Sequence, residues 1–524
     1  MIKRIYFILS LAFCANAVAQ CDSVQVGNDM TVSSDILISG TYVIDGTFTI
    51  QSGVTVFVTP HTTNGCGELK IYADEIIING TINGNYAGFG GGAGGFKGQS
   101  VSSITGHSTS LTTCGDSGTE GHISIEGGMA GEDGEGSGGG FAGADGQDGS
   151  GSKQYCGNFG DEAGLIGGAG GAGGGAGGSY GGTGAPGSNG GNGTNMATVS
   201  DLDIEDSYGA TLGTGGTGGN QGSAYGTLSG RDIQLGSGGA GAGGGGRSFY
   251  LGSDGFNGGA GGGLIFLHAT GDVTIDGTIS VDGQDGTFGG NGGSGDATDD
   301  CCSDGCNGCD ERTFSCGSGP GAGSGGGSGG GIFIECLGLA DIQGTLSAQG
   351  GAGGGSGQVG NGATCDYGGG GFCSSNSMST SNSDIAGEGG AGGGGRIKTY
   401  VSDCAQPNLA PSVDVNGGTG SNSGSDGNYA EICGYVGIEH LSESFLWSVY
   451  PNPFNELVNL HLPETVNANT PAQIVVIDAL GKVVSQYSFE QTINTINLNH
   501  LNKGIYFIQI QHNGLQDIRK ISKQ

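Results

Sequence analysis

Short runs of alternating apolar and polar residues recur along the chain and are punctuated by glycine. Their common unit is an aliphatic residue, a polar residue, Gly, Thr and an apolar residue, which occurs as Ile38–Tyr42, Ile44–Phe48, Ile78–Ile82, Ile275–Ile279 and Ile342–Leu346. Alternation with a period of two predicts β-strands, and Asp-Gly or Asn-Gly supplies the positive-φ corner between short strands. The pattern predicts short strands joined at glycine corners.

A longer repeat overlies the short one. Pairs of apolar strands begin mostly about 65 residues apart, a spacing that suggests stacked repeats, near Leu69, Ile123, Leu202, Leu264, Ile332 and Ile397. Such repeats stack because each unit buries a face that it cannot bury alone. We therefore expect an all-β fold, a Gly-rich right-handed parallel β-helix. A β-sandwich of hairpins is the alternative, because the corner chemistry suits both.

Long glycine-rich excursions separate these strands, and 126 of the 524 residues are glycine. Every third residue from Gly175 to Gly193 is glycine, the spacing of a helix with three residues per turn. The stretch contains only one proline, Pro186, so an isolated segment would lose much backbone entropy on ordering. Two interpretations stay open: a bundle of polyglycine II helices, or disordered loops. Similar stretches occur at 167–194, 213–219, 237–245, 319–331, 350–357 and 387–395.

The two ends of the chain differ from its middle. Lys3 and Arg4, the apolar run 5–13 and Ala17-Val18-Ala19 have the order of a secretory signal peptide, which predicts such a peptide over residues 1–19. No later apolar run is long enough to span a membrane. From residue 446 glycine becomes rare, and about seven short strands predict an immunoglobulin-like β-sandwich. The predicted order is signal peptide 1–19, N-terminal β repeats 20–84, Gly-rich repeat region 85–435, linker 436–445 and C-terminal domain 446–524.

Charge and cysteine content indicate an extracellular protein without a nucleic-acid partner. The formal net charge of −34 repels nucleic acids and anionic lipids. Cys14 would leave with the signal peptide, and an even number of cysteines in an exported chain predicts disulfides. Cys306 and Cys309 have a zinc-compatible spacing, but export favours disulfides there too. The disulfide candidates are Cys21, Cys66, Cys114, Cys156, Cys301, Cys302, Cys306, Cys309, Cys316, Cys336, Cys365, Cys373, Cys404 and Cys433.

Calcium is the more plausible metal cofactor. Carboxylates stand among glycine turns at Glu132–Glu135, Asp145–Asp148 and Asp282–Asp285, which suits an oxygen-rich site. Solvated loops are the preferred explanation of these motifs, so no metal ligand is assigned. No catalytic residue is assigned either. Isolated histidines such as His61, His107, His122 and His268 lack metal spacing and are expected to be surface or packing residues.

Four features of the last eighty or so residues occur in a specific order. They are Tyr450-Pro451-Asn452-Pro453, a turn at Gly481, a strand with Gly504 and Tyr506, and a terminus with Lys520 and Lys523. In this order the region resembles the C-terminal sorting domain of type IX secretion cargo. The resemblance implies two partners, the outer-membrane translocon and a sortase-like peptidase that would cut between Cys433 and Phe445. It also implies release from the cell or attachment to a surface glycolipid.

The expected protein is a secreted or cell-surface repeat protein that acts as an adhesin, a matrix component or a binding scaffold, with a surface glycan as one candidate partner. The alternative is a carbohydrate-active β-helix enzyme, either a polysaccharide lyase or a glycoside hydrolase. The scarcity of basic residues argues against a lyase, whereas glycoside hydrolysis needs only two carboxylates.

Overall fold

The computed structural model divides the chain into two compact units, residues 1–435 and 436–524. It is all-β, and no helix occurs in the part of the chain that it describes. The predicted signal peptide lies outside that part. The described residues are 23–62, 65–97, 128–147, 151–156, 161–166, 169–193, 198–199, 213–246, 252–293, 296–299, 312–315, 318–361, 364–366, 377–379, 385–402, 408–433, 448–462, 471–478, 482–491, 493–512 and 515–523.

Three parallel sheets organise the first unit. Sheet A contains β1 (Ser23–Val26), β4 (Gly40–Ile44), β7 (Glu68–Ala73), β13 (Leu264–Ala269), β18 (Gly331–Cys336), β23 (Arg396–Val401) and β25 (Asn428–Ile432). Sheet B contains β2 (Met30–Val32), β5 (Thr47–Ile50), β8 (Glu75–Ile78), β14 (Val273–Ile275) and β19 (Ala340–Ile342). Sheet C contains β3 (Ile36–Ile38), β6 (Thr55–Val58), β9 (Thr81–Asn83), β15 (Thr278–Ser280), β20 (Thr345–Ser347) and β24 (Ser412–Asp414).

The chain visits these sheets in turn, and strands of successive passes are neighbours in each sheet. Within sheet A, Ile265 pairs with Leu69 on one side and with Ile332 on the other. All pairs in the three sheets are parallel, so the alternative of a hairpin sandwich is wrong for this unit. β13 pairs directly with β7, so no pass lies between them in the sheet. The repeats expected at Ile123 and Leu202 fall outside the described residues.

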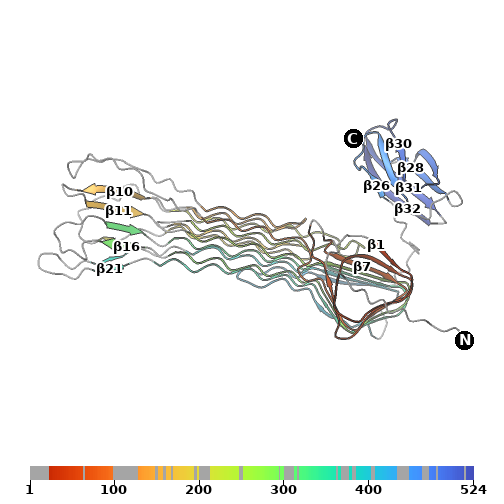
Figure 1. Cartoon of the computed structure of the whole chain (residues 1–524), viewed down its shortest axis with the longest axis horizontal. Helices are drawn as coiled ribbons and strands as arrows, with labels where there is room; N and C mark the ends of the chain where they lie inside the picture. Colours follow the sequence, from red (N-terminus) through yellow and green to blue (C-terminus); the bar gives the residue numbers. More distant parts are fainter. Residues whose placement is uncertain are drawn as a thin grey trace. The chain divides into compact units, whose positions relative to one another are not determined.

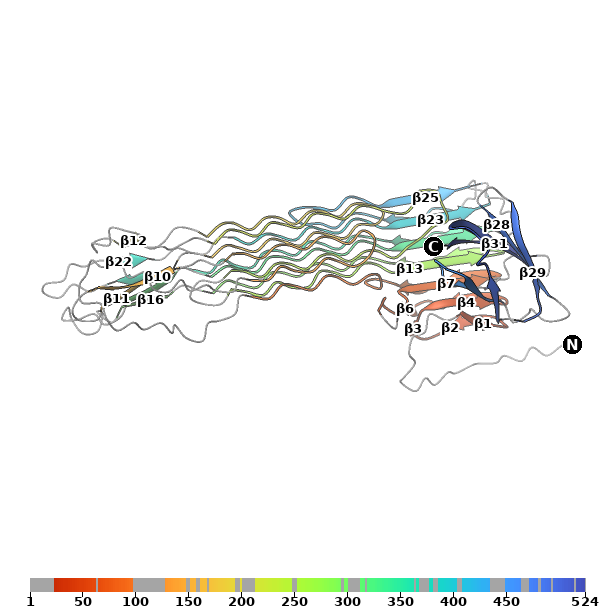
Figure 2. The ribbon, with the colours of Figure 1, turned by 90° about the horizontal axis from the view of Figure 1, so that it is seen from above.

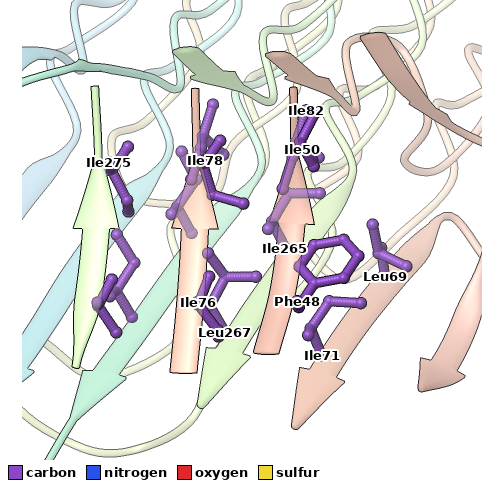
Figure 3. Close-up of a cluster of buried hydrophobic side chains, with 14 of the residues drawn as sticks. Phe48, Ile50, Leu69, Ile71, Ile76, Ile78, Ile82, Ile265, Leu267 and Ile275 are labelled. Atoms are coloured by element: carbon purple, nitrogen blue, oxygen red, sulfur yellow. The ribbon is translucent and has the colours of Figure 1, made fainter. Parts of the chain in front are cut away.

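Alternate side chains of the strands meet between the three sheets and form one hydrophobic core. Figure 3 shows Phe48, Ile71, Ile76 and Ile265 within it, and none of these four is accessible to solvent. Burial of a side chain of this size stabilises a fold by about 1.5–3 kcal/mol. The apolar residues of the predicted alternation therefore face this core, and the polar residues between them face the outside of the sheets.

The corner glycines are required for two different physical reasons. Gly46, in an Asp-Gly corner, has the expected positive φ of 144°, and Gly40, which follows Ser39, also has a positive φ of 93°. Gly80 and Gly277, in Asn-Gly and Asp-Gly corners, do not have positive φ, so positive φ was the wrong explanation for them, and Gly344 does not have it either. They stack between passes: a Cβ on Gly277 would lie 1.8 Å from the carbonyl oxygen of Gly80, and one on Gly344 would lie 2.1 Å from that of Gly277.

The glycine-rich excursions are extended segments that lie side by side in a bundle. Figures 1 and 2 show this bundle between the three sheets and the strands labelled β10, β11 and β16. Segment 169–180 illustrates its bonding, with backbone hydrogen bonds of 2.7–3.3 Å to six neighbouring segments. It donates to segments 138–147, 182–191 and 323–326, and accepts from 216–219, 240–246 and 387–393. Successive peptide groups therefore point in different directions, each toward another neighbour.

Close packing explains why the bundle consists of glycine. A Cβ on Gly325 would lie 1.9 Å from the carbonyl oxygen of Ala176, and one on Gly241 would lie 1.9 Å from that of Ala93. Alanine occurs where a methyl group fits between segments, as in the buried cluster of Ala172, Ala242, Ala322 and Ala386. The third-residue rule seen around Gly175 thus marks positions that face a neighbouring backbone.

Two small sheets lie at the end of the bundle away from sheets A, B and C (Figures 1 and 2). They join strands from separate excursions. The first contains β10 (Gly151–Cys156), β11 (Asp161–Ile166), β17 (Arg312–Ser315) and β16 (Asp296–Asp299). The second contains β12 (Thr198–Val199), β22 (Ser377–Ser379) and β21 (Thr364–Asp366).

The second unit consists of two antiparallel sheets whose buried side chains form one cluster. Strands β26 (Ser448–Tyr450), β27 (Leu457–His461) and β30 (Ile493–Asn497) make one sheet. Strands β29 (Val483–Phe489), β28 (Ala472–Asp478), β31 (Gly504–His512) and β32 (Leu515–Lys523) make the other. The cluster includes Phe454, Leu460, Ile474, Ile508 and Ile521.

Candidate functional sites

An aromatic ladder follows the outward face of sheet A. The rings of Phe266 and Phe333, from neighbouring strands, stack with centroids 4.7 Å apart. Tyr72 lies 5.5 Å from Phe266, and Tyr400 lies 5.0 Å from Phe333. Residues 225–235, which we call the covering loop, lie over this face, and the Tyr400 hydroxyl donates to the Ser229 carbonyl at 2.6 Å. Phe333 is consequently inaccessible to solvent.

Charged residues fasten the covering loop to the sheet. Glu335, of which 1% is exposed, accepts hydrogen bonds from Arg231 and from Nδ1 of His268, the latter at 2.8 Å. The Lys398 ammonium, equally buried, donates to the carbonyl oxygens of Gly230 at 2.7 Å and Asp232 at 2.6 Å. A buried charge with such partners is tolerated, whereas an unpaired one would be costly.

The same contacts shift two pKa values. Burial acts to raise the pKa of Asp232, but hydrogen bonds from Thr227 and Lys398 outweigh it and lower the pKa to about 2. Burial lowers the pKa of Lys398, and the contact with Asp232 opposes that shift. These groups bind one another and the backbone, so their evident role is to tie the loop down. The sequence signal that could have indicated them is the pair Arg396 and Lys398, basic residues within a predicted strand of an acidic chain.

The acidic motifs proposed as calcium sites hold the chain together where the structure describes them. Asp282 Oδ1 accepts from the Ser347 hydroxyl at 2.5 Å and from the Gln349 amide at 2.8 Å. Asp285 Oδ1 accepts from the Ala352 amide at 2.7 Å. In the motif Glu132–Glu135, Asp133 Oδ1 accepts a hydrogen bond from the Ala142 amide at 2.8 Å. These carboxylates bind amides of adjacent segments, and no cluster of three or more metal-ligating side chains occurs among the described residues.

His61 and His268 make contacts with neighbouring side chains and backbone, as expected for packing residues. His61 Nδ1 lies 3.4 Å from the Cys66 carbonyl oxygen, and its ring meets the edge of Phe89. His268 binds Glu335 beneath the covering loop. His107 and His122 lie outside the described residues, as does the end of the motif Asp145–Asp148.

The cysteines follow the disulfide expectation at two described positions and depart from it at one. Cys66 takes part in a disulfide, and so does Cys433. Cys336 is free, which corrects its assignment as a disulfide candidate. Its side chain points into the core, where its Sγ lies 3.4 Å from the Gly271 carbonyl, and burial raises the pKa of the thiol to about 11. The remaining candidates lie in segments whose side chains the structure does not describe.

In the second unit, Asn452 ties the opening segment to the last strand. Its Nδ2 donates to the Lys520 carbonyl at 3.0 Å, and its Oδ1 accepts from the Ser522 amide at 2.9 Å. The Phe454 amide donates to the Ser522 carbonyl at 2.9 Å. The two ends of the domain are thus joined. The sequence contained the opening motif and the lysine-bearing terminus but did not indicate that they are in contact.

Lys523 completes this connection. Its ammonium donates to the carbonyl oxygens of Leu498 at 2.6 Å and Asn499 at 2.9 Å. The ammonium also lies 5.9 Å from the ring centre of Phe454, which is 1% exposed. Such a cation–π contact contributes about 0.5–1 kcal/mol at a partly exposed site. Phe454 was not among the predicted motif residues, although it directly follows them.

The remaining motif residues lie around the joined ends. Gly504, with a φ of 156°, pairs with Lys523 across β31 and β32, and the Tyr506 hydroxyl donates to the Asn502 carbonyl at 2.9 Å. Tyr450 is half exposed and pairs with Asn459 across β26 and β27. Pro451 lines an open groove, and Pro453 directly precedes Phe454. Gly481 lies outside the described residues.

Comparison with known families identifies this second unit. Residues 448–524 match the family described as "Secretion system C-terminal sorting domain". The unit is a type IX secretion C-terminal sorting domain, as the motifs suggested. No curated protein matches the chain.

This domain determines what can be stated about the protein's destination. A type IX sorting tail directs its carrier to the type IX machinery and hence out of the cell or onto its surface. None of the described residues forms a helix with the length and apolarity to cross a bilayer. The chain is thus a type IX secretion cargo that carries a large Gly-rich unit.

Proposed function

We propose that the protein is a non-enzymatic, surface-displayed binding scaffold in which a parallel β-helix supports a polyglycine II stalk. The β-helix is inferred from the strand order, in which each of five successive passes, from β1 to β20, adds one parallel strand to each of sheets A, B and C. The observation that carries the functional proposal is the bundle, in which segment 169–180 is hydrogen-bonded to six neighbours. Side-chain chemistry is almost absent from these central segments, so their contribution is stiffness.

The dimensions of the bundle favour a stalk. A polyglycine segment rises about 3.1 Å per residue, so the thirteen residues from Ser318 to Gly330 extend about 40 Å. Such a length holds one end of the unit well away from the other. The two small sheets at the far end join strands from separate excursions, which is a suitable arrangement for a binding surface on a rigid support.

The domain boundaries at 20, 85 and 436, the signal peptide and the immunoglobulin-like form of the sorting domain are part of the same proposal. The route would be export to the periplasm, recognition of residues 446–524 by the translocon, and removal of the sorting domain by a sortase-like peptidase. Attachment to a surface glycolipid would then place the stalk on the outer surface.

The alternative, a carbohydrate-active enzyme, finds less support. The most enzyme-like group among the described side chains is Glu335 with His268 and Arg231. Its carboxylate is bound by both partners beneath the covering loop, and a glycosidase instead needs two carboxylates that face the sugar.

Export and binding can be tested on the full chain in a bacterium with a type IX system. We expect deletion of residues 448–524 to abolish its appearance outside the cell. The secreted protein is then screened on whole cells and glycan arrays, beside a variant in which residues 151–166 and 296–315 are replaced by short Gly-Ser turns. Loss of binding without a change in melting temperature supports the scaffold. Unchanged binding by this variant would refute the small sheets as the binding surface, and release of reducing sugar from a bound glycan would refute the non-enzymatic scaffold.

A further inference from the structure

Three neighbouring segments of the bundle each expose one phenylalanine. The segments are 88–97, 252–262 and 281–293, and their phenylalanines are Phe96, Phe256 and Phe288, exposed by 70%, 44% and 74%. The first two segments are joined by the Gly255 amide, which donates to the Gly95 carbonyl at 2.9 Å. The second and third are joined by the Gln284 amide, which donates to the Ala260 carbonyl at 2.8 Å.

The three segments form one layer on one side of the bundle. Each is hydrogen-bonded on its inner side to a central segment: Gly92 to Gly239, Gly259 to Gly325, and Gly327 to Gln284. The central segments 236–246 and 318–331 are themselves neighbours, because the Gly325 amide donates to Ala240. A layer that covers two adjacent central segments presents a continuous outer face.

The three phenylalanines also stand at nearly the same height along the bundle. The bond between Gly255 and Gly95 sets Phe256 beside Phe96. The Thr287 hydroxyl donates to the Asn257 carbonyl at 3.2 Å, which sets Phe288 beside Phe256. Backbones joined by hydrogen bonds lie about 5 Å apart, so the Cα atoms of the three phenylalanines follow a transverse row across the layer.

Packing of the bundle does not account for this row. The buried contacts of the bundle are made mainly by glycine, alanine and serine, whereas these three phenylalanines are exposed. The Phe288 ring lies against the backbone of Gly355 on the next segment. Exposed large apolar side chains that gather on one face of a protein often mark an interaction surface.

Polar groups border the row and limit the choice of partner. Lys97, next to Phe96, forms an ion pair of 3.6 Å with Asp254. Asn257, next to Phe256, accepts at Oδ1 from the Gly94 amide at 3.0 Å, and the Thr287 hydroxyl donates to the Asn257 carbonyl. The protein carries a net charge of −34, which opposes both a polyanion and a second copy of the same chain. An uncharged partner that offers apolar faces and hydroxyl groups fits best.

We propose that Phe96, Phe256 and Phe288 form a binding platform for a neutral polysaccharide. The C–H groups of a pyranose ring carry slight positive charge and stack on the negative face of an aromatic ring. A sugar chain lying across the segments would place successive rings over successive phenylalanines, while its hydroxyl groups meet Lys97, Asn257 and Thr287. This inference names a ligand class for the stalk and rests on the proposed function only in requiring that the protein reach the outside.

The test uses the secreted full chain and insoluble neutral glycans, namely cellulose, chitin and β-1,3-glucan, in sedimentation assays at physiological salt. The variant replaces all three residues, Phe96→Ala, Phe256→Ala and Phe288→Ala. Phe141→Ala is the matched control, because Phe141 is 51% exposed on segment 138–147, which does not adjoin this layer. We expect the triple variant to bind at least one of these glycans about tenfold more weakly, a loss of about 1.4 kcal/mol, and the control to bind like the wild type.

Three outcomes would overturn the inference. They are no binding of the wild type to any of the three glycans, equal binding by the triple variant, and equal loss in the control. Concentration-dependent self-association that disappears in the triple variant would also overturn it, because the occupant would then be a second copy. Export of each variant is measured separately in the culture medium, so a failure of the proposed route is distinguishable from a failure of the platform.

Discussion

Substitution of one central glycine tests the packing of the bundle most directly. Gly325 lies in segment 318–331, and a Cβ there would lie 1.9 Å from the carbonyl oxygen of Ala176 on a neighbouring segment. Carbon and oxygen atoms that are not bonded normally stay more than about 3 Å apart, so Gly325→Ala requires a movement of more than about 1 Å. The segment has neighbours on all sides, so it cannot move without disturbing them.

The magnitude follows from two terms. Overpacking in a close-packed interior costs about 1–3 kcal/mol. The displacement also strains the hydrogen bonds of Gly325 to Ala240 and Gly259, each worth about 1 kcal/mol. Reduced entropy of the unfolded chain returns about 0.4–1 kcal/mol for a Gly-to-Ala change. We therefore expect a net destabilisation of about 2–4 kcal/mol.

Gly90→Ala is the matched control within the same bundle. The nearest atom to a Cβ on Gly90 is the Glu135 Oε2 at 3.2 Å, the end of a flexible side chain. We expect its effect to stay within about 1 kcal/mol of the wild type. Denaturant unfolding gives the free energies, and hydrogen exchange shows whether the amides of segments 169–180 and 318–331 lose protection. Equal stability of the two variants would refute the described packing.

Four further predictions concern other parts of the molecule. Lys523→Met should weaken the contact between the two ends of the sorting domain beside Phe454 and lower the exported fraction measured by cell fractionation. Lys482→Met is the control, because Lys482 is exposed and lies directly before β29. Glu335→Gln should weaken the fastening of the covering loop by about 1–3 kcal/mol and increase its cleavage in limited proteolysis. The lowered pKa of Asp232 means that its contribution is complete above its ordinary value of 3.8 and is lost as pH falls toward about 2. Cleavage of the loop should thus be constant down to about pH 4 and rise below it. Cys336 should resist alkylation in the native protein and react after unfolding, as mass spectrometry would show.

Much of the local structure was predictable from the spacing of residues. The alternation around Ile275 and Ile342 indicated strands, and the motifs beginning at Tyr450 indicated the sorting domain before the family comparison. The contacts within the candidate sites could not be predicted from the sequence, because they join residues far apart in the chain. Asn452 meets Lys520 and Ser522, and Glu335 meets Arg231, across separations that no local pattern encodes.

The corner glycines show the same division. Positive φ is a local property and was expected correctly at Gly46 in its Asp-Gly corner. At Gly277 the requirement is the approach of another pass of the chain, which depends on how passes stack. The acidic motif at Asp282 likewise resembled a loop or a calcium site until its partners Ser347 and Gln349 were placed beside it.

The sequence by itself determined the strand periodicity, the acidic charge, the scarcity of basic residues and the export domain, because each depends on composition or on short-range order. Only the tertiary structure decided whether the glycine segments bond to one another, which amides the carboxylates bind, and that the segments carrying Phe96, Phe256 and Phe288 are neighbours. Glycine has no side chain with which to encode a partner. The arrangement of its backbone is therefore fixed by the many neighbours it meets after folding.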